Sequence, residues 1–168
     1  AGVMVATWCV LAWCSRLPAD PQHAPSRSLV SKDTPIGRGL AAMPPPAPGR
    51  SGIWALPTPI EAFATRVAMV RAATRTVDLQ YYIWKGDMTG QLLLDELRLA
   101  ADRGVRVRLL VDDNGTSGMD ADLAALDAHP NVEVRIFNPF VLRRFKPLGL
   151  LVVFNRLHRR MHNKSLTA

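Results

Sequence analysis

The sequence predicts an α/β protein whose mostly parallel β-sheet is flanked by helices, and three observations lead to this fold class. Residues 76–137 alternate β-rich and helix-type segments with short connections, a pattern typical of parallel strands joined by right-handed crossovers. Residues 1–14 are apolar, whereas residues 15–59 are rich in proline, alanine and serine. The composition, 48% hydrophobic and 21% charged over 168 residues, suits one modest globular domain behind a leader and a tether.

The first predicted unit is the apolar leader, residues 1–14. Its length and position suit the hydrophobic part of a secretory signal. The ending Leu-Ala-Trp-Cys before Ser15 resembles a bacterial lipoprotein signal, with Cys14 as the lipidated residue, and the alternative is an uncleaved apolar anchor. No apolar run in the chain reaches the ~18–20 residues that a membrane-spanning helix needs. Both alternatives predict a membrane-associated protein of the bacterial cell envelope.

Residues 15–59 are the second predicted unit, a proline-rich linker that includes Pro44–Pro46. The segment has too few apolar side chains to offset the entropy of ordering it. We expect it to space the domain, residues 60–168, from a membrane.

The domain is expected to begin with a helix over residues 60–75, where apolar side chains recur at helical spacing with arginines on the other side. A β-strand follows over Thr76–Trp84, with Val77, Leu79, Tyr81 and Ile83 on one face. Tyr81 and Tyr82 then face opposite sides of this strand. One of them is expected to line a site and the other to pack.

The next elements continue the alternation. A helix over Gly90–Ala101 is expected to end at Arg103-Gly104, and a strand over Val105–Val111 to turn at Asp112-Asp113-Asn114-Gly115. A helix over residues 120–128 stops before Pro130, and a third strand spans Val132–Phe137. In such sheets the functional site lies at the carboxyl ends of the strands. The apolar segment Pro147–Phe154 is expected to be a buried strand or helix, with an exposed segment that faces acyl chains as the alternative.

Positive charge concentrates near the end of the chain. The net charge is +7, and residues 135–168 contain no Asp or Glu, which leaves the rest of the chain close to neutral. The basic residues of this stretch are Arg135, Arg143, Arg144, Lys146, Arg156, Arg159, Arg160 and Lys164. Such a field attracts phospholipid head groups, nucleic acid or phosphorylated small molecules.

Within this basic stretch, His162 and Lys164 form a candidate phosphate site. Two residues apart on an extended segment, they project to the same side. An imidazole nitrogen beside an ammonium is the pair needed to attack and hold a phosphate ester. A His-x-Lys triplet is expected by chance in roughly one in ten chains of this composition, so the triplet alone is a weak motif.

Four longer segments make the pattern specific. They are DLQYYIW (78–84), LLLDELRLAADRGVRVRLLVDDNGT (92–116), LDAHPNVEVRIFNPF (126–140) and NRLHRRMHNKSLTA (155–168). In order and spacing they resemble the phospholipase D superfamily, and within it the bacterial cardiolipin synthase C-like proteins. The resemblance covers about residues 60–168 and implies the N-terminal half of a phospholipase D-like fold. The family motif is His-x-Lys followed after four residues by Asp, and that Asp would come directly after Ala168.

The resemblance implies phosphodiester transfer on phospholipids in two displacement steps. One histidine forms a phosphohistidine while a second protonates the leaving alcohol, and lysines hold the phosphate oxygens, so that no metal or cofactor is implied. His162 would be the nucleophile or the general acid, and Lys164 would bind the phosphate. The implied partners are an anionic phospholipid such as phosphatidylglycerol, the membrane surface, and a second copy of the motif supplied in cis or by a dimer. Residues 1–168 alone are therefore expected to be nearly inactive.

Other interpretations of these residues fit the sequence less well. His158 and His162 are spaced like a helical zinc pair, but Arg159 stands where that pattern has Glu, so metal binding is not expected. Asp112 and Asp113 are expected to cap and turn the strand end, with a supporting role at the site left open. One alternative for function is a nuclease of the same superfamily, although a membrane tether fits a lipid substrate better. The other is a noncatalytic module that binds anionic lipid or nucleic acid.

Overall fold

The computed structural model describes residues 2–14, 32–140 and 158–168, and in these residues the predicted fold class is confirmed. The elements in chain order are α1 (Gly2–Cys14), α2 (Pro35–Ala41), α3 (Pro59–Ala72), β1 (Thr76–Ile83), α4 (Met88–Asp102), β2 (Arg106–Gly115), α5 (Asp120–Asp127), β3 (Val132–Phe137) and β4 (Lys164–Thr167). The segment Pro147–Phe154 lies outside the described residues, as do Arg143, Arg144, Lys146 and Arg156.

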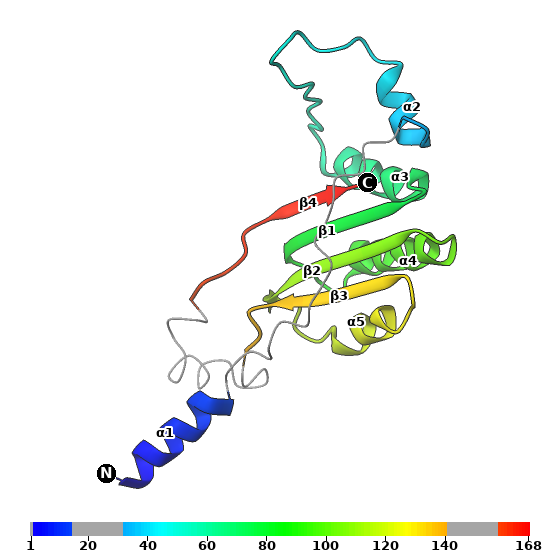
Figure 1. Cartoon of the computed structure of the whole chain (residues 1–168). Coiled ribbons are helices and arrows are strands. Elements are labelled where there is room, and N and C mark those ends of the chain that lie inside the picture. The colour runs from blue at the N-terminus through cyan, green and yellow to red at the C-terminus, as the bar shows by residue number, and fades with distance from the viewer. Residues whose placement is uncertain (1, 15–31, 141–157) are drawn as a thin grey trace.

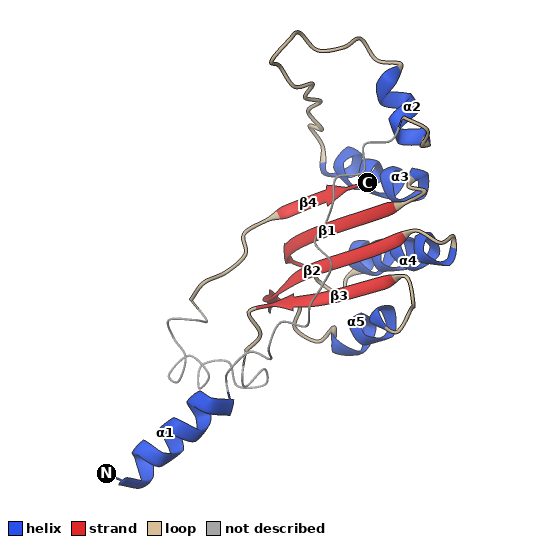
Figure 2. Cartoon of the chain, in the orientation of Figure 1, coloured by secondary structure: helices blue, strands red, loops and turns tan. Residues whose placement is uncertain are grey.

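The sheet is mostly parallel, with the strand order β3-β2-β1-β4 (Figure 2). Strand β2 pairs in parallel with β1 on one side and with β3 on the other. The last strand, β4, pairs with β1 in the antiparallel direction and places Leu166 opposite Leu79. The carboxyl ends of β1 and β2 therefore meet the beginning of β4, which is where the sequence places His162 and Lys164.

Helices α3, α4 and α5 gather along one side of the sheet, as Figure 1 shows. The core lies between these helices and the sheet, and Val70, Val77, Leu97, Val107 and Val111 in it are completely buried. The predicted apolar face of β1 is therefore confirmed at Val77. The face ends before Ile83, which is 49% exposed at the end of the strand.

The helix ends follow ordinary capping chemistry. At the start of α3 the Thr58 side chain accepts from the Glu61 backbone N–H, while the Glu61 carboxylate accepts from the Thr58 backbone N–H, which forms a capping box. The Asp87 side chain caps α4 by accepting from the Gly90 N–H at 2.9 Å. Gly104, at φ +87°, ends α4 where the sequence predicted. Helix α3 ends at Ala72 rather than at residue 75.

Strand β2 is longer than the sequence predicts. It was expected to turn at Asp112, but it continues to Gly115, which pairs with Ile83 across an irregularity between β1 and β2. The Trp84 N–H donates to the Gly115 carbonyl at 3.2 Å, so the ladder persists beyond the polar residues. Asp112 and Asp113 are therefore buried strand residues, 0% and 1% exposed.

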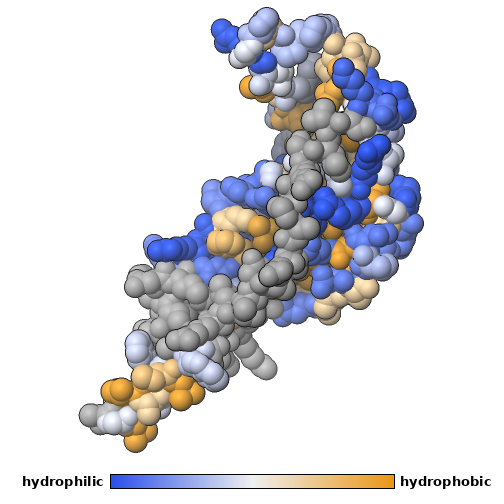
Figure 3. Space-filling view, in the orientation of Figure 1, coloured by the Kyte–Doolittle hydropathy of each residue, from blue (hydrophilic) through white to orange (hydrophobic). Residues whose placement is uncertain are grey.

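The N-terminal part contains two helices outside the sheet layer. Helix α1 exposes apolar side chains that include Val3 (81% exposed) and Trp13 (69%), and Figure 3 shows it as a mostly hydrophobic surface. Among the residues that the structure describes, no helix has the length and apolarity needed to cross a bilayer. Helix α2 was not predicted: it lies within residues 15–59, starts at the capping residue Thr34, and contacts α3. The unit boundaries at residues 14 and 59 stay predictions.

Candidate active site

The structure brings His162 and Lys164 together at the carboxyl edge of the sheet. Lys164 is the first residue of β4 and stands opposite Tyr81 of β1. Its Nζ lies 3.1 Å from Nε2 and 3.4 Å from Nδ1 of His162, and both residues are exposed. Since an ammonium only donates hydrogen bonds, the imidazole nitrogen that it contacts acts as the acceptor. The pair is accessible to a ligand, and its catalytic roles stay predictions.

Tyr82 is the aromatic support of this pair. Its ring lies 4.9 Å from the His162 ring, centroid to centroid, at a tilt of 55°. The Lys164 Nζ lies 5.3 Å from the centroid of the same ring, which is within the range of a cation–π contact. The Asn114 amide donates to the Tyr82 hydroxyl oxygen at 3.2 Å. Of the two tyrosines that the sequence offered, Tyr82 is therefore the one at the site.

The backbone on both sides of His162 is fixed to the sheet. The Met161 N–H donates to Oδ2 of Asp112 in β2 at 3.0 Å. The Asn163 carbonyl accepts from the Tyr82 N–H of β1 at 2.9 Å. The Asn163 side chain also donates to Gln80 at 2.9 Å. The His162 side chain is exposed, but the backbone on both sides of it is hydrogen-bonded to the sheet.

The acid pair Asp112-Asp113 organises the chain around the site. The Asp113 carboxylate accepts from the backbone N–H of Phe140, after β3, at 2.6 Å. Asp112 accepts from Arg160, before β4, at 3.0 Å. The expected local cap is also present, because Asp112 accepts from the Asn114 N–H at 2.8 Å. The sequence left a supporting role open for these residues, but nothing in the local pattern identified their distant partners.

Part of the predicted positive field is neutralised by acids. Arg160 pairs with Asp112, and Arg135 pairs with Glu133 at 2.5 Å. Of the basic residues in this stretch that the structure describes, Arg159 and Lys164 are exposed. Among the residues that the structure describes, no group of three or more His, Cys, Asp or Glu side chains is arranged to hold a metal ion.

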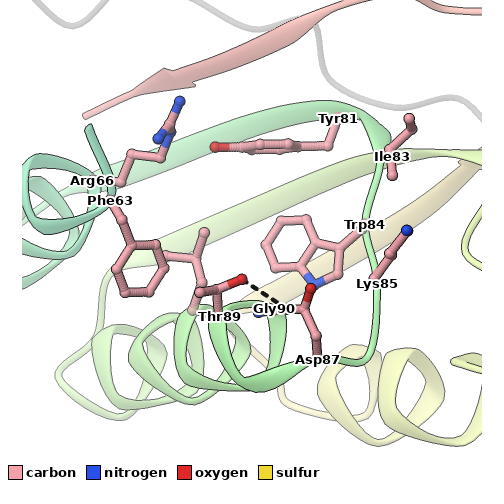
Figure 4. Close-up of a pocket in the computed structure, with 10 residues that line it drawn as sticks. Phe63, Arg66, Tyr81, Ile83, Trp84, Lys85, Asp87, Thr89 and Gly90 are labelled. Carbon is pink, nitrogen blue, oxygen red and sulfur yellow. Dashed lines mark hydrogen bonds between the residues drawn. The ribbon is translucent and has the colours of Figure 1, made fainter. Parts of the chain in front are cut away.

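A cavity of about 290 Å³ lies between α3, β1 and the start of α4 (Figure 4). Its walls combine aromatic rings with two cations, and the lining residues are Phe63, Arg66, Tyr81, Ile83, Trp84, Lys85, Asp87, Thr89, Gly90 and Leu93. The Tyr81 and Trp84 rings meet edge to face, with centroids 5.0 Å apart. Burial raises the pKa of the Tyr81 hydroxyl, and nearby Arg66 opposes that rise. Tyr81 therefore lines the cavity, and the next residue of β1, Tyr82, contacts the His162–Lys164 pair.

Comparison with known proteins agrees with the resemblance read from the sequence. No family model matches the chain. Cardiolipin synthase C of Escherichia coli is 54% identical over 120 residues, which cover 71% of this chain and 25% of that protein. A Helicobacter pylori protein described as uncharacterized is 38% identical over 144 residues, which cover 83% of this chain and 29% of that protein. A cardiolipin synthase of Staphylococcus aureus is 39% identical over 59 residues, 35% of this chain and 12% of that protein.

Among solved structures, the crystal structure of a phospholipase D family member, Nuc from Salmonella typhimurium, covers 61% of this chain and 54% of its own chain. The identity is 20% and the TM-score is 0.39. The similarity in sequence confirms the resemblance to bacterial cardiolipin synthase C-like proteins. The chain is a homologue of cardiolipin synthases, and it aligns with about a quarter of the length of cardiolipin synthase C.

Proposed function

We propose that this chain supplies one half of the active site of a phospholipase D-type phosphatidyltransferase. The observation that carries the proposal is the exposed His162–Lys164 contact at 3.1 Å, in a chain homologous to cardiolipin synthases. In this proposal a phosphodiester binds at the carboxyl edge of the sheet. The Lys164 ammonium leaves the imidazole and holds a nonbridging phosphate oxygen, which stabilises the charge that develops there.

The reaction proceeds by two displacements at phosphorus. In the first, a histidine nitrogen lone pair forms the N–P bond while the bond from phosphorus to the leaving alcohol breaks. A second histidine gives its proton to the departing oxygen. In the second step an acceptor alcohol or water attacks phosphorus, its proton passes to that second histidine, and the N–P bond breaks. His162 fills one of the two histidine roles, and the other histidine comes from a second motif in cis or in a dimer.

The proposed substrate is an anionic phospholipid of the phosphatidylglycerol kind, presented at a membrane surface. The exposed apolar helix α1 supports a location at the bacterial cell envelope, whether as an uncleaved anchor or as part of a signal that ends in lipidated Cys14. The exposed cations Arg159 and Lys164 suit a negatively charged head group.

The test is a lipid transfer assay on an enzyme that contains residues 1–168 together with a second motif. Vesicles of phosphatidylglycerol are incubated with the enzyme, and cardiolipin and glycerol are measured by mass spectrometry. We expect His162→Ala to lower turnover by at least about 10³-fold, because the displacement loses either its nucleophile or its proton donor. His158→Ala is the matched control, since this exposed histidine lies four residues earlier on the same segment and should leave turnover within about twofold.

The alternatives give different results in the same experiment. Cleavage of DNA with no lipid product would favour the nuclease. Vesicle binding without turnover in the complete enzyme would favour the noncatalytic module. Residues 1–168 alone should turn over close to background, and strong activity from them that is lost in His162→Ala would show that one motif suffices.

A further inference from the structure

Asp112 is a completely buried carboxylate that accepts hydrogen bonds from three donors. It lies near the end of β2, between β1 and β3, and is 0% exposed. Its two oxygens accept from the Asn114 N–H at 2.8 Å, from Arg160 Nη1 at 3.0 Å and from the Met161 N–H at 3.0 Å. A carboxylate removed from water is costly unless it is paired and hydrogen-bonded, so these contacts are needed to keep it buried.

Two of the three donors belong to the residues directly before His162. The Arg160 guanidinium is itself held firmly: it also donates to the Asn138 carbonyl at 3.1 Å and lies 4.3 Å from the centroid of the Phe140 ring. Its side chain is only 15% exposed. Asn138 in turn donates to the Arg159 carbonyl at 2.7 Å. Residues 159–161 are therefore fixed to the interior although they lead into an exposed site.

We propose that Asp112 is a positioning residue for His162. The peptide N–H of residue 161 is held by β2 through Asp112, and the carbonyl of residue 163 is held by β1 through the Tyr82 N–H. His162 is the single residue between these two anchors. Its ring reaches solvent, but its Cα is fixed relative to two strands, which restricts where the reacting nitrogen can lie.

The consequence for the reaction rests on the proposed function, in which His162 acts at phosphorus. Strand β4 alone gives weak support, because it contains four residues and, among the strands that the structure describes, pairs with β1 alone. Without the Asp112 anchor, His162 would follow the fraying of the strand end. Misplacement of a reacting group by about 1 Å can cost roughly 10²-fold in rate.

The test compares Asp112→Asn with Asp113→Asn in residues 1–168. Asp113 is the matched control because it is the next residue, is buried to within 1%, and accepts from the Phe140 N–H after β3. Backbone ¹⁵N relaxation reports the order parameters of the His162 and Asn163 amides. We expect these to fall from about 0.85 to below about 0.6 in Asp112→Asn and to stay near the wild-type value in Asp113→Asn.

A second variant separates positioning from simple loss of folding. Asp112→Asn leaves Arg160 without its charged partner, so Asp112→Val/Arg160→Met replaces both members by apolar side chains. This variant retains a packed interior but offers no acceptor to the Met161 N–H. We expect the order parameters of the His162 and Asn163 amides to fall in this variant as well. Thermal unfolding, measured in parallel, shows whether the variant is folded.

Kinetics on the complete enzyme supply the second readout. Both Asp112 variants should lower kcat by about 10–100-fold with KM within about twofold, whereas Asp113→Asn should keep kcat within about threefold. Unchanged order parameters in both Asp112 variants, or equal loosening in Asp113→Asn, would overturn the positioning role. In a further outcome, the wild-type enzyme transfers no phosphatidyl group, but the order parameters of His162 still fall in both Asp112 variants. The positioning role of Asp112 would then stand, and the proposed function would fail.

Discussion

His162 is exposed, and its ring is held by contact with Tyr82 rather than by burial. The same tyrosine ring lies beneath the Lys164 ammonium. A single side chain of β1 thus sets the relative position of an imidazole and an ammonium. Its flat face is what matters for both contacts, while its hydroxyl only accepts from Asn114.

Substitution at Tyr82 should therefore separate the ring from the hydroxyl. We expect Tyr82→Leu to lower kcat/KM for phosphatidyl transfer about 10-fold, because ring contacts of this kind contribute about 1 kcal/mol. Tyr82→Phe keeps the ring and should stay within about twofold of the wild type. Steady-state kinetics on an enzyme that contains residues 1–168 measures both. Equal losses in the two variants would mean that the hydroxyl, not the ring, is responsible.

At the scale of elements, β1 and β2 approach each other closely at Gly115. A Cβ at this position would lie 2.3 Å from the Tyr82 carbonyl oxygen and 2.6 Å from the Ile83 Cα. Both contacts are backbone, which cannot move aside without separating the strands. The glycine is therefore required by the approach of the neighbouring strand.

Gly115→Ala should destabilise the domain by about 2–3 kcal/mol, because the strands must separate to admit the methyl group. It should also displace Tyr82, and with it the support of His162. Chemical denaturation followed by circular dichroism gives the free energy of unfolding. Gly52→Ala is the control, since nothing lies within 4 Å of a Cβ there. Similar stability for the two variants would contradict the close approach.

Helices α3 and α4 are joined by an ion pair that makes stability depend on pH. Arg71 donates through Nε to Glu96 at 2.9 Å and contacts it again through Nη2. The hydrogen bond from Arg71 lowers the pKa of the Glu96 carboxyl below its ordinary value of 4.5. A carboxyl with a lowered pKa in the folded state stabilises the protein above pH 4.5, and this stabilisation is lost as the pH falls through the lower, folded-state pKa.

Arg71→Met should therefore lower the urea midpoint of unfolding at pH 6.5, and lower it less at pH 3, where a larger share of Glu96 is protonated in the wild type. The effect is modest because the Arg71 side chain is 65% exposed. Urea unfolding at the two pH values measures the difference. Arg98→Met, which removes an exposed pair within α4, should have a smaller effect at pH 6.5 than Arg71→Met. An Arg71→Met effect of the same size at both pH values would point to lost packing instead.

The regular elements were largely predictable because their patterns are local. Alternation at Val77 and Leu79 locates β1, and the Arg103-Gly104 signal ends α4 as expected. The length of β2 was not predictable, because Asp112 and Asn114 favour a turn locally while the pairing of Gly115 with Ile83 favours the strand. Helix α2 was not predicted from the sequence, because its seven residues include two glycines and a proline.

The candidate site likewise has one part that the sequence predicts and one part that it does not. His162 and Lys164 were predicted to share a side, since their two-residue spacing is a local property, and the structure brings them together. The Arg160–Asp112 contact joins residues 48 positions apart, and no periodicity or motif encodes such a pairing. Two adjacent acids after a strand therefore predicted a turn rather than an anchor.

At the scale of the whole molecule, the apolar helix α1 and the basic residues near His162 should bind membranes by different forces. Deletion of residues 1–14 should reduce flotation of the protein with phosphatidylglycerol vesicles by at least about fivefold, because the apolar contact is lost. Arg159→Gln should have a small effect that disappears at 1 M salt, where charges are screened within about 3 Å. Vesicle flotation at low and high salt measures both. Binding that is independent of residues 1–14 would assign membrane contact to the domain.

The long-range hydrogen bonds on either side of His162 also determine when the site forms during folding. Strands β1 and β2 are linked by the Asp78–Arg108 pair, 30 positions apart, whereas the site is closed by contacts that span 49 positions (Asp112 with Met161) and 83 positions (Gln80 with Asn163). Closing larger loops costs more entropy, so these contacts are expected to assemble last and to open first. Pulse-labelled hydrogen exchange should therefore protect the β2 amides before those of β4. Chemistry at His162 would then become available only to chains that have finished folding.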